Sequence, residues 1–282
     1  MTKYKLPQVP GPIGVFDSGY GGLTILKSIR EELPQYDYLY LGDNARSPYG
    51  PRSFEVVYDF TLQAVNKLFE MGCHLVILAC NTASAKALRS IQQNDLPYID
   101  PERRVLGVIR PTVEIIGELT RNNHVGILAT SGTIKSESYN IELEKFYPGI
   151  TVTGQPCPMW VPLIENNEFR DEGADYFVQK YIDALLEKDP EIDSIILGCT
   201  HYPLLMEKIR KYCPSNIRLI PQGDYVAKSL RKYLEKHTEM EKSCTKGGHC
   251  KFLTTESSEK FAENATIFLS KEIHAEKISL DR

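Results

Sequence analysis

The sequence predicts an α/β fold with two pseudo-symmetric domains, each a mostly parallel sheet flanked by helices, and an active site in the cleft between them. Short apolar segments rich in β-branched residues alternate with longer segments of helical periodicity, the pattern of βα units around a parallel sheet. The length of 282 residues is about twice that of a typical domain. A weak internal repeat also relates the two halves of the chain.

The apolar segments predict eight strands, taken in chain order. They cover residues 13–16, 38–41, 75–79, 105–109, 125–128, 151–154, 194–197 and 218–220. Helical periodicity predicts a helix after each strand, at residues 22–32, 54–71, 83–94, 111–120, 134–146, 173–187, 204–212 and 225–236. Two adjacent glycines within residues 242–251 predict an exposed turn, followed by a last strand and a C-terminal helix at 258–273.

The internal repeat consists of two pairs of similar segments. IGVFDS at 13–18 resembles VGILAT at 125–130, which alone could be chance. LVILACNT at 75–82 also resembles SIILGCTH at 194–201, and this pair shares a cysteine at the same strand-to-helix corner. The repeat predicts two related halves, and we expect the chain to leave the first domain and return to it. The expected domains are residues 1–107 with 218–282, and residues 108–217.

Composition and charge exclude several classes of function. The chain is 42% hydrophobic and 25% charged, so it has the composition of an ordinary globular protein. Its net charge of −4 provides no overall positive field for nucleic acid or anionic lipid. No segment approaches the roughly 18 apolar residues of a membrane span, and the N-terminal segment lacks a secretory apolar stretch. We expect a cytoplasmic protein with no nucleic-acid or membrane partner.

The seven cysteines are an odd number scattered along the chain, which does not indicate a disulfide framework. Cys80 and Cys199 follow predicted strands, at the corners where open α/β sheets bind ligands. The dipole of the following helix is expected to lower their thiol pKa below its usual value of about 8.5. The cysteines expected to be apolar core residues are Cys73, Cys157 and Cys213.

Two thiols that face each other across a cleft suit inversion at a carbon acid. A thiolate can remove the proton on one face while a thiol supplies a proton on the other. No dinucleotide or phosphate-binding glycine motif is present, and no lysine stands at either cysteine corner to bind pyridoxal phosphate, so no cofactor is expected. Cys244, His249 and Cys250 lack the two-pair spacing of a zinc site and predict a solvated loop without metal.

Several motifs resemble those of glutamate racemase, in the Asp/Glu racemase family. They are VFDSGYGG at 15–22, GDNARSPYG at 42–50, ACNTA at 79–83, TSGT at 130–133, VPLIE at 161–165 and LGCTHYP at 197–203. The resemblance covers nearly the whole chain. It implies cofactor-independent interconversion of L- and D-glutamate, supply of D-glutamate to bacterial peptidoglycan, and a small-molecule substrate. A homodimer is compatible with it.

The resemblance also implies a role for each matching residue. Cys80 and Cys199 would be the two acid/base thiols, with Cys80 facing the α-proton of D-glutamate and Cys199 that of L-glutamate. Asp17, His201 and Glu165 would assist the proton transfers. The residues implied to contact the substrate are Asp17, Ser18, Tyr49, Gly50, Asn81, Thr82, Thr130, Thr133, Thr200 and His201.

Other interpretations stay open on the sequence alone. An aspartate racemase would share the paired thiols, and a two-domain small-molecule binding protein would hold inert ones. A cysteine hydrolase could use Cys199 and His201, but it would leave Cys80 without a purpose. Asp17 could only cap a helix, and Glu165 could be a surface carboxylate unless the chain folds it over the cleft.

Overall fold

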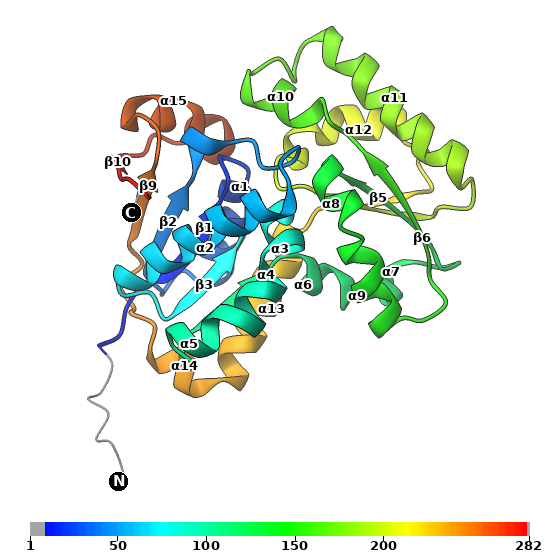
Figure 1. The fold of residues 1–282 in the computed structure, drawn as a ribbon. Coiled ribbons are helices and arrows are strands. Elements are labelled where there is room, and N and C mark those ends of the chain that lie inside the picture. The colour runs from blue at the N-terminus through cyan, green and yellow to red at the C-terminus, as the bar shows by residue number, and fades with distance from the viewer. Residues whose placement is uncertain (1–8, 281–282) are drawn as a thin grey trace.

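The computed structural model describes residues 9–280, which form two sheets flanked by helices (Figure 1). The first sheet contains β1 (Ile13–Asp17), β2 (Tyr38–Gly42), β3 (Leu75–Leu78), β4 (Arg104–Gly107), β9 (Cys250–Thr254) and β10 (Ala275–Lys277). The second contains β5 (His124–Ala129), β6 (Thr151–Pro156), β7 (Ser194–Gly198) and β8 (Arg218–Ile220). Every pairing between these strands is parallel, which confirms the predicted fold class.

The two sheets share one strand order. Part of the first sheet runs β2-β1-β3-β4, and the second runs β6-β5-β7-β8. The strands β1 and β3 therefore occupy the places that β5 and β7 occupy in the second sheet. These are the strands that carry the two repeated sequence segments. Cys80 and Cys199 consequently follow topologically equivalent strands, β3 and β7.

The helices cover both faces of the sheets. In chain order they are α1 (Gly22–Glu32), α2 (Phe54–Glu70), α3 (Asn81–Lys86), α4 (Leu88–Ser90), α5 (Leu96–Ile99), α6 (Ile109–Val113), α7 (Ile116–Leu119), α8 (Ser131–Lys135), α9 (Ser138–Phe146), α10 (Trp160–Glu165), α11 (Glu172–Lys188), α12 (Met206–Tyr212), α13 (Gly223–Lys236), α14 (Thr238–Lys242) and α15 (Ser258–Leu269). None of the described helices is long and apolar enough to cross a membrane.

Some predicted helices are divided in the structure. The helix expected at 134–146 is split into α8 and α9 because Glu137 has a left-handed φ of 54°. The helix expected at 83–94 begins earlier, at Asn81, and gives way to a π turn at Ile91–Asp95. Strand β10 was not predicted, because its three residues are exposed or half-buried and carry no apolar pattern.

The chain crosses between the sheets twice, after β4 and after β8. Strand β8 pairs with β7, so residues 218–220 lie in the second sheet and not in the first domain, where the sequence analysis had placed them. A strand of three residues at a crossing has no pattern that reveals its partner. We propose that, of the described residues, 9–107 and 221–280 form the first domain and 108–220 the second.

Several cysteines belong to the buried core. Cys73, Cys157 and Cys213 are buried as predicted. The exposed turn predicted for residues 242–251 is wrong at Cys244, which is 5% exposed. The Cys244 Sγ donates to the Met240 carbonyl oxygen at 3.3 Å, and its backbone pairs with Gly11. The unpredicted helix α14 returns the chain to the core just before this cysteine.

Candidate active site

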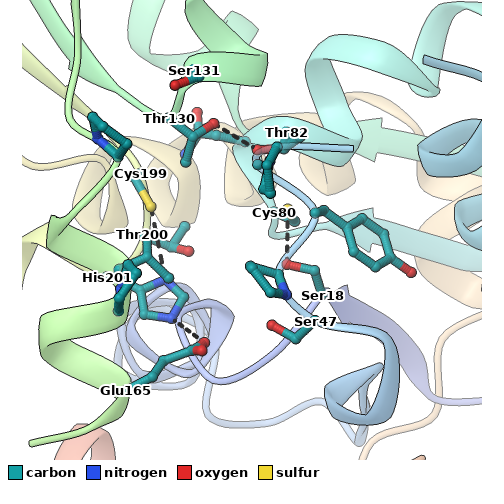
Figure 2. Close-up of a pocket in the computed structure, with 18 of the residues that line it drawn as sticks. Ser18, Ser47, Cys80, Thr82, Thr130, Ser131, Glu165, Cys199, Thr200 and His201 are labelled. Atoms are coloured by element: carbon teal, nitrogen blue, oxygen red, sulfur yellow. Dashed lines mark hydrogen bonds and ion pairs between the residues drawn. The ribbon is translucent and has the colours of Figure 1, made fainter. Parts of the chain in front are cut away.

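A cavity of about 150 Å³ lies between the two sheets, at the carboxyl ends of their strands (Figure 2). Segments that follow six of the strands line it, and α10 closes one side. Open parallel sheets bind ligands in this position. The lining residues are Asp17, Ser18, Ser47, Pro48, Tyr49, Gly50, Pro51, Cys80, Asn81, Thr82, Thr130, Ser131, Cys157, Pro158, Val161, Pro162, Glu165, Cys199, Thr200 and His201.

Cys80 and Cys199 lie on opposite sides of this cavity (Figure 2). Cys80 ends the turn after β3 and caps α3, with its Sγ accepting from the Ala83 amide at 3.4 Å. The Ser18 hydroxyl lies 3.4 Å from the same sulfur. Each cysteine is 6% exposed. The structure therefore brings together the two thiols that the sequence repeat singled out.

Burial determines the protonation of Cys80. Burial, reinforced by the negative charge of Asp17, raises the pKa of the Cys80 thiol to about 12. Hydrogen bonds from Ser18 and the Ala83 amide lower this pKa by less than burial raises it. The expectation that a helix dipole lowers the pKa of Cys80 is therefore wrong. Helix α3 has only six residues. The free energy of desolvating a buried thiolate is larger than the stabilisation that the dipole of so short a helix provides.

On the other side, Cys199 begins a chain of three titratable groups. Its Sγ lies 3.7 Å from His201 Nδ1, and His201 Nε2 lies 3.0 Å from Glu165 Oε1. Burial disfavours the imidazolium, but the hydrogen bonds to Cys199 and Glu165 outweigh it and raise the pKa of His201 well above its ordinary value. Helix α10 holds Glu165 over the cavity, where its side chain is 20% exposed.

Asp17 is the last residue of β1, where it lines the cavity and is 1% exposed. Its Oδ2 accepts from the Gly19 amide at 2.9 Å. Burial raises the pKa of Asp17, and the facing charge of His201 and the amides of Gly22 and Gly19 lower it by a smaller amount. Asp17 is therefore a buried carboxyl group that lines the cavity, close enough to His201 and Cys80 to influence their ionisation.

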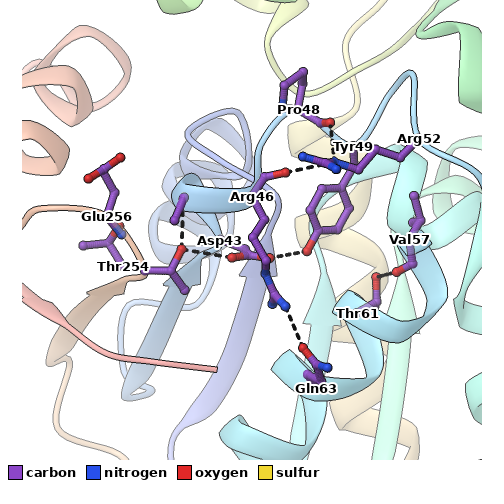
Figure 3. A network of polar contacts seen from close by, with 12 residues as sticks. Asp43, Arg46, Pro48, Tyr49, Arg52, Val57, Thr61, Gln63, Thr254 and Glu256 are labelled. Atoms are coloured by element: carbon purple, nitrogen blue, oxygen red, sulfur yellow. Dashed lines mark hydrogen bonds and ion pairs between the residues drawn. The ribbon is translucent and has the colours of Figure 1, made fainter. Parts of the chain in front are cut away.

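Tyr49 lines the cavity, and its hydroxyl is engaged in a network of polar contacts (Figure 3). That hydroxyl donates to Asp43 Oδ2, and Asp43 also accepts from Arg46 Nε at 2.7 Å and Thr255 Oγ1 at 2.9 Å. Arg46 Nη1 donates in turn to Gln63 Oε1 at 2.6 Å. This buried network fixes the loop that carries Tyr49 and Gly50.

Three predicted contact residues bridge the two halves through hydroxyl groups. Thr82 Oγ1 on α3 lies 2.9 Å from Thr130 Oγ1, and Thr130 caps α8 by accepting from the Thr133 amide at 3.2 Å. Thr82 and Thr130 line the cavity. Thr133 lies behind them, 1% exposed, and the structure does not place it at the cavity wall.

Asn81 lines the cavity, but its carboxamide is already hydrogen bonded inside the protein. Its Nδ2 donates to Gln222 Oε1 at 2.6 Å, and its Oδ1 accepts from the Tyr139 hydroxyl at 2.8 Å. The backbone amide of Asn81, in the first turn of α3, is the group best placed to meet a ligand.

The structure adds lining residues that the sequence analysis did not select. Ser47, Pro48, Pro51 and Ser131 lie within or beside recognised motifs, so the motifs themselves could have indicated them. Val161 and Pro162 on α10 lie within the motif at 161–165 and could have been indicated in the same way, whereas Cys157 and Pro158, in the turn after β6, lie in no recognised motif.

The acidic and basic side chains that line the cavity are Asp17, Glu165 and His201. Among the described residues that line it, the cationic candidate is His201, and none is lysine or arginine. Anionic groups would therefore be held by His201, by hydroxyl groups and by amides at the starts of helices. Within residues 9–280, no three His, Cys, Asp or Glu side chains are arranged to hold a metal ion.

Comparison with known sequences finds relatives along nearly the whole chain. Residues 13–230 match the family described as Asp/Glu/Hydantoin racemase. A protein named glutamate racemase from Ruegeria sp. (strain TM1040) is 40% identical over 271 residues, which cover 93% of this chain and 97% of that protein. Another of that name from Persephonella marina is 38% identical and covers 96% and 98%.

Solved structures share the fold. A glutamate racemase isoform from Bacillus anthracis gives a TM-score of 0.87 at 32% identity, covering 96% of this chain and 98% of that one. Glutamate racemase from Francisella tularensis subsp. tularensis SCHU S4, solved in complex with D-glutamate, gives 0.85 at 35% identity and covers 98% and 99%. The similarity extends over both sheets and over the segments that line the cavity.

Proposed function

Because this chain belongs to the glutamate racemases of the Asp/Glu/hydantoin racemase family, we propose that it interconverts L- and D-glutamate without a cofactor. Family membership makes it an amino-acid racemase, an isomerase. The observation that most supports a two-base mechanism is the placement of Cys80 and Cys199 on opposite sides of one cavity. A carbon acid held between them would meet one sulfur on each face.

In the L-to-D direction, Cys199 acts as the base and Cys80 as the acid. The Cys199 thiolate removes the α-proton of L-glutamate, and the Cys80 thiol gives a proton to the opposite face of the α-carbon. His201 supports this step, because an imidazolium beside the Cys199 sulfur stabilises the thiolate. Glu165 accepts the other imidazole N–H and thereby stabilises the imidazolium.

In the D-to-L direction the roles are reversed, and Cys80 must lose its proton. The raised pKa of Cys80 opposes this step, and the bound substrate would lower that pKa. Part of the rise comes from the negative charge of Asp17. When the substrate ammonium group lies against Asp17, it balances that charge, and the pKa of Cys80 falls. Ser18 and the Ala83 amide then stabilise the thiolate by hydrogen bonds.

Two separate regions of the cavity would hold the two carboxylates of glutamate. The backbone amides at the cysteine corners, including those of Asn81 and Thr200, would hold the α-carboxylate. The backbone near Gly50 and the hydroxyl of Thr130 would hold the side-chain carboxylate. A dicarboxylic acid that is one methylene shorter would satisfy only one of these regions, so aspartate should be a much poorer substrate than glutamate.

The product of the L-to-D reaction would serve bacterial peptidoglycan synthesis, and we place the enzyme in the cytoplasm. Two other functions fit part of the geometry. The Cys199–His201–Glu165 chain resembles the nucleophile, base and orienting group of a cysteine hydrolase, but that mechanism leaves Cys80 unused. A small-molecule binding protein would leave both thiols inert.

Circular dichroism of the purified protein with L-glutamate and no added cofactor tests the proposed function. The signal should decay to zero as the racemic mixture forms, and aspartate under the same conditions should change far more slowly. An unchanged signal at high enzyme concentration contradicts the proposal. Iodoacetamide tests the inert-thiol alternative, because alkylation that D-glutamate slows places a reactive cysteine in the substrate site.

A further inference from the structure

Gln222 lies at the point where the chain returns from the second sheet to the first. It stands between β8 and α13 and is 2% exposed. Its Nε2 lies 3.1 Å from the carbonyl oxygen of Val108, which occupies the outgoing crossing between β4 and α6, and 3.1 Å from Thr112 Oγ1. One buried carboxamide therefore ties together both crossings between the sheets.

The same carboxamide reaches the residue next to Cys80. Gln222 Oε1 accepts from Asn81 Nδ2 at 2.6 Å, and Asn81 directly follows Cys80. Gln222 Nε2 also lies 2.9 Å from the Tyr139 hydroxyl oxygen, and this hydroxyl donates to Asn81 Oδ1 at 2.8 Å. Asn81, Gln222 and Tyr139 thus form a closed ring of hydrogen bonds, which we call the amide ring.

Tyr139 connects the amide ring to the other cysteine corner. A Cβ placed on Gly198 would lie 3.3 Å from Tyr139 Cε2, so the aromatic side chain packs against the backbone of the residue that precedes Cys199. Tyr139 is 2% exposed, and Gly198 is also buried. Close-packed interiors transmit small displacements. The amide ring therefore contacts the chain immediately beside each thiol.

We propose that Gln222 is a positioning residue that sets the separation and facing of the Cys80 and Cys199 thiols. The inference rests on the proposed two-thiol racemisation. Gln222 itself does not line the cavity, so it acts through Asn81 and Tyr139. Proton transfer on opposite faces of one α-carbon requires both sulfurs within reach of it. A misplacement of about 1 Å can cost about 100-fold in rate.

The variant Gln222→Met tests this role, because it keeps the length of the side chain and removes its hydrogen bonds. We expect kcat to fall about 100-fold in both directions, with a much smaller change in KM. The matched control is Gln155→Met on β6, since Gln155 is also buried and its Nε2 donates to the carbonyl of the neighbouring Pro156. Its kcat should stay within about twofold of the wild type.

A short bifunctional thiol reagent provides a readout that does not depend on catalysis. Peptide mass mapping would quantify the bridge between Cys80 and Cys199 and separate it from products at Cys157. The yield of this bridge should fall severalfold in Gln222→Met and stay unchanged in Gln155→Met. If Gln222→Met fails to fold, Tyr139→Phe replaces it. That variant keeps the aromatic side chain packed against Gly198 and removes the hydroxyl group that takes part in the amide ring.

The outcomes separate this inference from the proposed function. The wild-type protein could fail to racemise glutamate while its bridge yield still depends on Gln222. That result would contradict the proposed function and would still support the positioning role of Gln222. An active enzyme whose kcat and bridge yield are the same in Gln222→Met overturns the positioning role. A fall in kcat with an unchanged bridge yield overturns it as well, because Gln222 would then act by another route.

Discussion

Glu165 offers the most informative single substitution, because its contact with Cys199 runs through His201. Glu165→Gln keeps the size of the side chain and removes its charge. In the structure, Glu165 Oε1 lies 3.0 Å from His201 Nε2, and His201 Nδ1 lies 3.7 Å from the Cys199 sulfur. The substitution therefore weakens the imidazolium that stabilises the Cys199 thiolate, without touching either sulfur.

The size of the effect follows from the strength of this hydrogen bond. A hydrogen bond to a charged group contributes about 1.5–3 kcal/mol. Where catalysis needs the imidazolium, that range corresponds to about 10- to 150-fold in rate. Because the Glu165 side chain is 20% exposed and partly screened, we expect a fall in kcat of about 10- to 50-fold.

The assay is the dependence of racemisation on pH, measured by circular dichroism from both enantiomers. Loss of the carboxylate lowers the pKa of His201, so the pH above which activity declines should move down. L- and D-glutamate have equal free energies, so kcat/KM must fall equally in both directions, and any asymmetry appears in kcat and KM separately. The control is Glu168→Gln, since Glu168 is exposed three residues further along. An unchanged pH profile with kcat within about twofold of the wild type would refute the role assigned to Glu165.

Three further predictions concern the thiols and their surroundings. Cys80→Ser and Cys199→Ser should each abolish racemisation, while each variant exchanges the α-proton of one enantiomer with solvent deuterium, as NMR would detect. Gly21→Ala should lower kcat by more than about tenfold, because the new Cβ would lie 2.3 Å from His201 Nδ1, whereas Gly173→Ala, with open space around its Cβ, should not. Burial raises the pKa of Cys80 to about 12, so the stability that the protonated thiol contributes is present at neutral pH and is lost as the pH rises toward 12. The free energy of unfolding in urea should therefore fall more steeply above pH 9 in the wild type than in Cys80→Ser; equal slopes would contradict the raised pKa.

The sequence predicted the sheets better than the helices. Strands such as β3 and β7 are continuous apolar segments, and a buried parallel strand requires nothing more. Helix boundaries depended on local backbone geometry, such as the left-handed φ at Glu137 and the π turn at Ile91–Asp95, which periodicity does not encode. The partner of β8 was not predictable, because tertiary packing decides which sheet a three-residue strand joins.

For the site, the motifs predicted which segments meet but not what each side chain does there. Tyr49 and Asn81 both lie at the cavity. However, the Tyr49 hydroxyl is bonded to Asp43, and the Asn81 carboxamide is bonded to Gln222 and Tyr139. Gln222 and Tyr139 lie far from Asn81 in the sequence and outside the motifs, and the motif that contains both Asp43 and Tyr49 does not show that their side chains bond to each other. The predicted direction of the pKa shift at Cys80 was wrong for a similar reason, because the burial that raises this pKa is a property of the folded molecule.

The central claim is that two thiols on opposite faces of the substrate exchange protons with its α-carbon. The most direct test is racemisation of L-glutamate in deuterium oxide, followed by NMR and mass spectrometry at early conversion. A two-base mechanism predicts that the D-glutamate formed carries deuterium at the α-carbon while the remaining L-glutamate still carries protium. Deuterium that enters the L-glutamate pool as fast as D-glutamate forms would contradict the account, because a single base would then serve both faces.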